Sequence, residues 1–181
     1  VLSLIGNGED CSLPPAIRNK NAAGAIVIGR VTKHHATVLL AEDIPYLFVG
    51  MHRDNFGKPV VDFDAEDAVH QITTKMLELE RGPVWLILQP TIDVYYFQEI
   101  LDGYQRAVFD SSDPVCNVHI NRDYDDETFY ERLVQRMIAS GQEHFPVILN
   151  YSHIRGLFAA LLRNDISLDR TSIAMSAGRE L

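Results

Sequence analysis

Short runs of apolar, often β-branched residues alternate along the chain with longer stretches in which apolar positions recur at helical spacing. We expect eight strands, at residues 1–5, 24–28, 46–49, 60–63, 84–88, 116–120, 146–150 and 172–175. Most of these runs are continuous rather than alternating, which is typical of strands buried on both faces of a sheet. Strands that alternate with helical segments indicate parallel sheets with crossover helices.

Four helices with recognisable ends are expected between these strands. Asp64 can cap a helix at residues 65–79. The apolar face of that helix consists of Val69, Ile72, Met76 and Leu79. Further helices are expected at 94–109, at 127–139 behind the acidic pair Asp125 and Asp126, and at 152–163. Residues 50–59 contain Asn, Gly and Pro and are expected to form a loop.

The pattern predicts the α/β class, with two parallel-sheet lobes, 1–83 and 84–181, that carry flanking helices and enclose a cleft. In open parallel sheets, ligands bind beyond the carboxyl ends of the strands. We therefore expect a small molecule to contact residues that follow strand ends. These residues are Arg30, Met51, Gln89, Tyr96, Tyr124, Asn150 and Tyr151.

Composition limits the partners and the compartment. The chain has 25 acidic and 16 basic residues, a net charge of −9, which disfavours broad contact with nucleic-acid backbones. Cys11 and Cys116 are far apart, without the spacing of a disulfide framework or a zinc site, so a reducing cytoplasm fits best. Residue 1 is not Met and no signal peptide precedes the first run, so the native start is expected to be missing.

Two short segments resemble a cofactor-binding motif and a metal-binding motif, and both motifs are incomplete. The segment Gly6-Asn7-Gly8 follows an expected strand, but the third Gly of a dinucleotide fingerprint is absent. Asp123, Asp125 and Glu127 alternate like the start of a calcium loop, yet Thr128 occupies the position where the turn requires Gly. A solvated helix start is the simpler interpretation, and no cofactor is expected.

Catalytic patterns are similarly weak. His34 and His35 are adjacent, so on a helix or strand their side chains point in different directions and do not readily share a metal ion. The chain has no Gly-x-Ser-x-Gly elbow, and Ser152 and His153 are sequence neighbours rather than residues that the fold brings together. An enzyme is therefore not expected.

Four segments, taken in order, resemble the sensor domain of the lac-repressor family of bacterial transcriptional regulators. They lie within a likeness that begins at the strand 23–28 and extends almost to the C-terminus. They are the Ile-Pro-led strand 44–49, the strand and Asp-led helix start at 61–68, the pair Gly103-Tyr104, and the strand 147–150 followed by Leu157, Ala159 and Leu161. Each segment is short and unspecific, and their shared order carries the resemblance.

The resemblance implies a periplasmic-binding-protein-like fold truncated at both ends, and a homodimer whose cleft binds a small-molecule effector, often a carbohydrate. Repressors of this family bind operator DNA through an N-terminal helix-turn-helix, which this chain does not contain. Helices of both lobes, including the one at 65–79, would supply dimer contacts.

Several positions depart from the family pattern. Ile100 stands where an Arg usually binds the ligand, Tyr151 replaces an Asp, and Gly50 replaces an acidic residue. An acidic pair corresponds approximately to Ala177 and Gly178, whereas Tyr124 matches an aromatic residue that stacks on the ligand in relatives. The pocket is therefore expected to be less charged and more aromatic than a typical sugar site.

Two other functions remain open at this point. A periplasmic solute-binding protein of a sugar transporter uses the same fold, and a secretion signal in the full-length sequence would favour it. An enzyme built on a Rossmann-like or flavodoxin-like sheet would carry a bound cofactor.

Overall fold

The computed structural model describes residues 13–28, 37, 39, 41–42, 44–50, 59–80, 82–90, 94–111, 115–123 and 125–176. Contacts divide the chain into two compact units, Val1–Phe63 and Asp64–Leu181. This boundary differs from the lobe boundary expected at 83 and 84, because the helix at 65–80 contacts elements of the second unit. The division of the whole protein into lobes remains a prediction.

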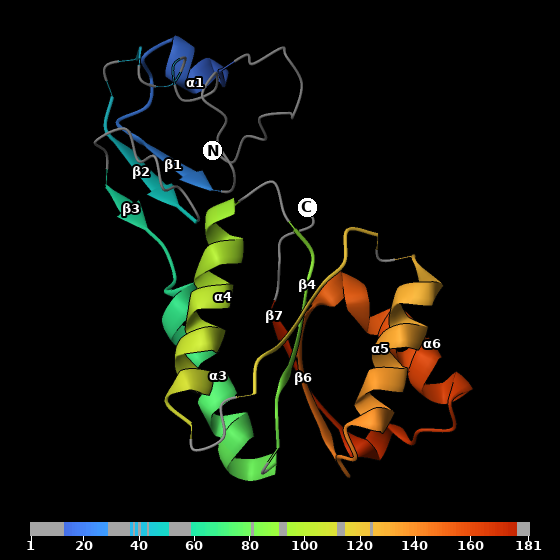
Figure 1. The fold of residues 1–181 in the computed structure, drawn as a ribbon. Coiled ribbons are helices and arrows are strands. Elements are labelled where there is room, and N and C mark those ends of the chain that lie inside the picture. Colours follow the sequence, from blue (N-terminus) through green and yellow to red (C-terminus); the bar gives the residue numbers. More distant parts are fainter. Residues whose placement is uncertain are drawn as a thin grey trace. The chain divides into compact units, whose positions relative to one another are not determined.

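The first unit contains a parallel sheet in the order β1-β2-β3. Its elements are α1 (Pro15–Arg18), β1 (Ala25–Ile28), β2 (Tyr46–Val49) and β3 (Val60–Val61) (Figure 1). A small core forms where Leu13 and Ile17 meet Leu39 and Tyr46. The expected continuous burial is wrong for β1, in which Ile26 and Ile28 are exposed. Exposed and half-buried residues alternate along this strand, so its exposed side chains share one face of the sheet.

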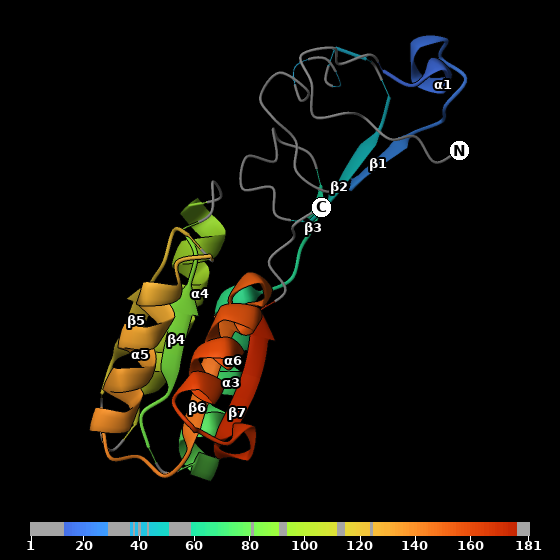
Figure 2. The same cartoon turned by 90° about the vertical axis from the view of Figure 1, so that its right-hand side faces the viewer.

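The second unit is a parallel sheet in the order β5-β4-β6-β7, covered by helices on both faces. The strands are β4 (Trp85–Leu88), β5 (Asn117–Ile120), β6 (Phe145–Asn150) and β7 (Thr171–Ser176). Helices α3 (Ala65–Glu80) and α4 (Val94–Phe109) lie on one face, and α5 (Glu127–Ala139) and α6 (Ile154–Arg163) on the other (Figures 1 and 2). Only the central strands β4 and β6 are buried along their whole length.

Helix starts follow the expected capping chemistry. The side chain of Asp64 accepts a hydrogen bond from the Asp67 N–H at 2.8 Å, and that of Asp126 accepts one from the Phe129 N–H at 3.2 Å. The left-handed φ of 71° at Gly141 lies just beyond the end of α5. The last expected helix begins instead with a 3₁₀ turn, Tyr151–His153, before α6.

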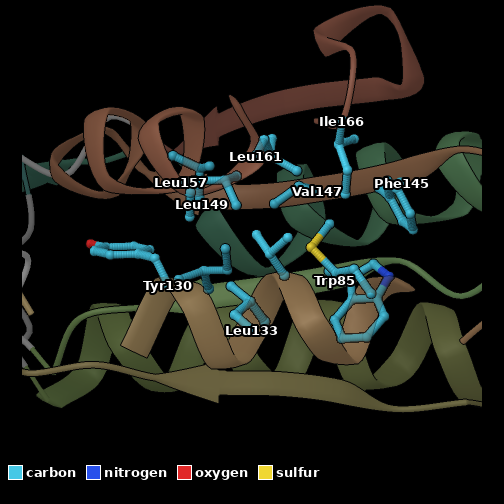
Figure 3. Packing of buried hydrophobic residues seen from close by; sticks show 13 residues of the cluster. Trp85, Tyr130, Leu133, Phe145, Val147, Leu149, Leu157, Leu161 and Ile166 are labelled. Atoms are coloured by element: carbon cyan, nitrogen blue, oxygen red, sulfur yellow. The ribbon is translucent and has the colours of Figure 1, made fainter. Parts of the chain in front are cut away.

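The main core lies between the sheet and the pair α5 and α6 (Figure 3). Side chains from β4 and β6, such as Trp85 and Leu149, interleave with Leu133 and Met137 of α5 and Leu157 of α6. Burial of this cluster is the principal stabilising contribution, since removing apolar area from water provides about 25 cal/mol per Å². In the described part of the chain, no helix has the length and apolar character needed to cross a membrane.

Candidate functional site

The site expected from the topology lies where the chain reverses direction across the second sheet. From β4 the chain passes through α4 to β5 on one side, and from β5 it passes through α5 to β6 on the other side of β4. The connections after β4 and β6 therefore diverge to opposite faces of the sheet. Such a switch point leaves a crevice at the carboxyl ends of the two strands, which is where ligands bind in open α/β sheets.

Three uncharged polar residues meet at this switch point. The backbone N–H of Gln89, directly after β4, donates a hydrogen bond to Oδ1 of Asn150 at 3.1 Å. The hydroxyl of Ser152 donates to Oε1 of Gln89 at 3.3 Å. The parallel register that pairs Ile87 with Leu149 brings these two strand ends together. Gln89 and Asn150 are thus the predicted ligand contacts that the structure places side by side.

Asn121 ends the neighbouring strand β5 and was missed by the sequence analysis. Its backbone N–H donates to the Leu88 carbonyl at 2.9 Å, which continues the β4–β5 ladder by one residue. Its side-chain Oδ1 accepts from the N–H of Asp123 at 3.1 Å, so the buried amide holds the turn before α5. An Asn directly after a strand and two residues before Asp is the local signal that could have revealed it.

Beneath this edge, Tyr130 of α5 and His153 form a buried polar pair. The Tyr130 hydroxyl lies 2.7 Å from Nδ1 of His153, and Asn121 hydrogen-bonds to the same hydroxyl. Burial is the main cause that raises the pKa of Tyr130 to about 12 and lowers the pKa of His153 to about 4. Both groups are therefore neutral at pH 7, and they position the turn that carries Tyr151 and Ser152.

A cavity of about 510 Å³ opens between the starts of α5 and α6. Tyr130, Tyr151 and Ser152 contribute to its wall, together with the oppositely charged Asp125 and Arg155. Its volume lies within the range of small-molecule sites, roughly 300–1,000 Å³. The cavity shares Ser152 with the Gln89 and Asn150 cluster, so the two features border each other.

The other predicted contacts differ in their exposure, and some lie outside the described residues. Tyr151 follows Asn150 and is 59% exposed, so its ring is accessible. Tyr96 is buried within α4, as is Ile100, which is only 1% exposed. Predicted contacts outside the described residues are Arg30, Met51 and Tyr124, and the same holds for Gly6 to Gly8, His34, His35, Ala177 and Gly178.

The part of the chain that the structure describes contains no candidate metal site. No three side chains of His, Cys, Asp or Glu come together there in a group that could hold a metal ion. Asp123 instead accepts a hydrogen bond from the N–H of Asp125 at 2.9 Å through its side chain. The local role of this acidic segment is therefore to shape the turn before α5.

No family model and no curated protein sequence matches the chain. Solved structures do match. The transcription regulator CcpA of Lactococcus lactis is 20% identical with a TM-score of 0.61, over 90% of this chain and 60% of that chain. A regulatory protein of the LacI family from Chloroflexus aggregans is 17% identical with a TM-score of 0.67, over 87% and 58%. The sugar-binding protein of a sugar ABC transporter from Bacillus halodurans is 15% identical with a TM-score of 0.64, over 86% and 55%.

The chain thus spans about 60% of the length of these solved proteins. At such low identity the likeness concerns the fold alone. The expected fold class is confirmed: the chain has the α/β fold, with parallel sheets and flanking helices, that these LacI-type regulators and this sugar-binding protein share.

Proposed function

We propose that this chain is the effector-sensing domain of a LacI-type transcriptional regulator and that it binds a small molecule without transforming it. One observation carries the proposal: Gln89, Asn150 and Ser152 form a cluster of uncharged hydrogen-bonding groups at the switch point of a sheet whose fold occurs in such regulators. Amide and hydroxyl groups both donate and accept hydrogen bonds, as recognition of a polar neutral ligand requires.

The effector we propose is a carbohydrate or a related metabolite. Gln89, Asn150 and Tyr151 would contact it from the second unit, and Tyr96 would support the site from α4. Arg30, Met51 and Tyr124 remain predicted contacts. The effector would control DNA binding by its different affinities for two conformations of the whole regulator, since only differential binding shifts such an equilibrium.

The whole protein would be a cytoplasmic homodimer that reaches operator DNA through a helix-turn-helix outside this chain. On α3, Val69 and Met76 are buried against neighbouring elements, whereas Ile72 and Leu79 remain exposed. Of the four apolar positions of α3, only Ile72 and Leu79 would therefore contribute to the dimer surface.

Calorimetry with Gln89→Ala tests the binding proposal. The backbone N–H of Gln89, not its side chain, bonds Asn150, so this substitution leaves that bond in place. We expect an effector found by thermal-shift screening to bind roughly tenfold or more weakly to the variant, the loss for a buried hydrogen bond of about 1.5 kcal/mol. The control Gln71→Ala removes an exposed amide of α3 and should change nothing. Equal affinity in all three proteins would contradict this site.

A solute-binding protein for sugar transport is the second candidate, supported by the similar fold of the Bacillus halodurans protein. The whole gene product distinguishes the two. Electrophoretic mobility shift of upstream DNA that responds to the effector supports the regulator, whereas export of the mature protein supports the transport component.

A further inference from the structure

A second pocket of about 310 Å³, the β5–α5 pocket, lies between strand β5 and helix α5. Residues 118–120 of the strand form one wall, and Phe129, Arg132, Leu133 and Arg136 of the helix form the other. It shares no lining residue with the switch-point cluster or with the cavity at the starts of α5 and α6. Its chemistry therefore calls for a separate explanation.

The charged groups of this pocket are both positive. Arg132 and Arg136 are four residues apart on α5, so they lie on the same side of the helix, one turn from each other. Among the described residues, neither of them forms an ion pair, whereas Arg163 bonds Glu131 at 2.5 Å and Arg106 bonds Glu66 at 2.7 Å. In a chain with 25 acidic and 16 basic residues, two neighbouring arginines without a carboxylate partner among the described residues give this pocket a local positive charge that favours an anion.

His119 adds a third polar side chain to the pocket wall. Its ring stacks on Trp85 with centroids 5.3 Å apart and planes 16° from parallel, which fixes its orientation. Within the described structure, its Nε2 is buried without a hydrogen-bond partner. Burial, followed by the nearby charge of Arg136, lowers the pKa of this imidazole. An unsatisfied buried polar atom destabilises the folded protein, so a ligand oxygen that formed a hydrogen bond with Nε2 would offset part of this cost.

We propose that the β5–α5 pocket binds a small phosphate monoester, with its oxygens between Arg132 and Arg136 and its organic group against Phe129 and Leu133. Planar guanidinium groups match the geometry of phosphate oxygens and remain charged at all physiological pH values. A dianion balances both arginines, whereas a single carboxylate balances one. The pocket volume is near the lower limit of small-molecule sites, which suits a compact ligand. This inference does not depend on the proposed effector site.

Titration of the 181-residue chain with phenyl phosphate at near-physiological salt tests the proposal. Calorimetry measures affinity, and the fluorescence of Trp85 reports location because it is the only tryptophan and stacks on His119. We expect saturable binding with a change in Trp85 emission. Arg132→Gln and Arg136→Gln should each weaken it roughly tenfold or more, as expected for loss of a charge-assisted hydrogen bond.

The matched control is Arg18→Gln, which removes the same charge from an exposed position on α1 that lines neither of the two described cavities, and it should leave the affinity unchanged. Inorganic phosphate, which lacks an organic group, should bind more weakly than phenyl phosphate. Benzoate, with a single negative charge, should also bind more weakly. Absence of saturable heat, equal losses in all three arginine variants, or benzoate binding as tight as phenyl phosphate would each overturn the proposal.

Discussion

The hydroxyl of Tyr130 lies 2.7 Å from Nδ1 of His153 and links α5 to the turn before α6 inside the main core. Neither side chain is exposed by more than 1%. Asn121 also hydrogen-bonds to this hydroxyl. The other ring nitrogen of His153, Nε2, has no partner among the described residues.

This pair predicts that the protein loses stability in mild acid. Burial lowers the pKa of His153 to about 4, so between the ordinary pKa of 6.5 and about 4 the unfolded chain binds a proton that the folded chain excludes. The contribution of neutral His153 to the free energy of unfolding should therefore be fully present above pH 6.5 and should decrease as the pH falls toward 4. A shift of this size corresponds to at most about 3.5 kcal/mol, at about 1.4 kcal/mol per pKa unit.

Urea denaturation at several pH values measures this loss. In His153→Gln the side chain can still accept from Tyr130 but no longer titrates, so the slope between pH 6.5 and 4 should flatten. His144→Gln removes an exposed histidine and should retain the wild-type slope. A slope unchanged in His153→Gln would show that other groups cause the acid sensitivity.

Gly103 allows α3 and α4 to approach closely, and Gly103→Ala should force them apart. A Cβ at this position would lie 2.2 Å from the backbone carbonyl oxygen of Glu66, an atom that cannot rotate away. We expect a destabilisation of about 2 kcal/mol or more, as for overpacked cores. Gly141→Ala serves as comparison, because its Cβ meets open space and only the left-handed φ costs about 1 kcal/mol. Equal midpoints for the two variants in denaturation would contradict this reason.

Tyr104, directly after Gly103, holds the entry to β4 and the start of β5. Its buried hydroxyl donates to the Val84 carbonyl at 2.6 Å and accepts from the Asn117 N–H at 3.0 Å. Tyr104→Phe leaves both backbone groups without this partner and should lower stability by about 2 kcal/mol. Tyr151→Phe removes an exposed hydroxyl and should leave the melting temperature unchanged. A melting temperature of Tyr104→Phe equal to that of the wild type would contradict this prediction and would mean that water replaces the hydroxyl.

Local signals predicted most of the second unit. The helices expected at 94–109 and 127–139 coincide with α4 and α5, because their apolar periodicity and end residues are encoded within a few turns. The four-residue α1 was missed, since it is too short to show a period. Exposure along β1 and β5 could not be predicted, because an apolar run does not reveal whether its strand lies at the edge of a sheet.

The candidate site was predicted only as far as the rule for strand ends reaches. That rule selected Gln89 and Asn150, which are far apart in the sequence. The register of β4 and β6 places them together. Asn121 was missed, although its hydrogen bonds to Asp123 two residues later form a turn with a local sequence signal. The pair Tyr130 and His153 was missed because its contact depends on how α5 packs over the sheet, and no pattern within one segment records that packing.

The last prediction concerns the effector. Charged side chains such as Arg and Asp bind hydroxyl groups through charge-assisted hydrogen bonds, which are about twice as strong as neutral ones. In this chain, Ile100 is buried in α4, Tyr151 is exposed beside Asn150, and Gly50 has no side chain. Each sugar hydroxyl left without a partner in a dry site would cost about 1–3 kcal/mol. Among carbohydrates and related metabolites, we therefore expect an effector that is flatter or less polar than a simple monosaccharide, with Tyr151 against one face and the amides of Gln89 and Asn150 at its edge.

A thermal-shift screen over monosaccharides, sugar phosphates, nucleosides and aromatic acids tests this expectation. The largest saturable rise in melting temperature should come from a ligand that carries a flat ring, and Tyr151→Ala should weaken its binding by about 1 kcal/mol, the value of one aromatic contact. Tyr151→Phe retains the ring and should bind as the wild type does. Arg132→Gln should bind this effector normally, because Arg132 lines the separate β5–α5 pocket and not the cavity that Tyr151 lines. Strong stabilisation by an unmodified monosaccharide alone would mean that the amides and Ser152 suffice without charged partners.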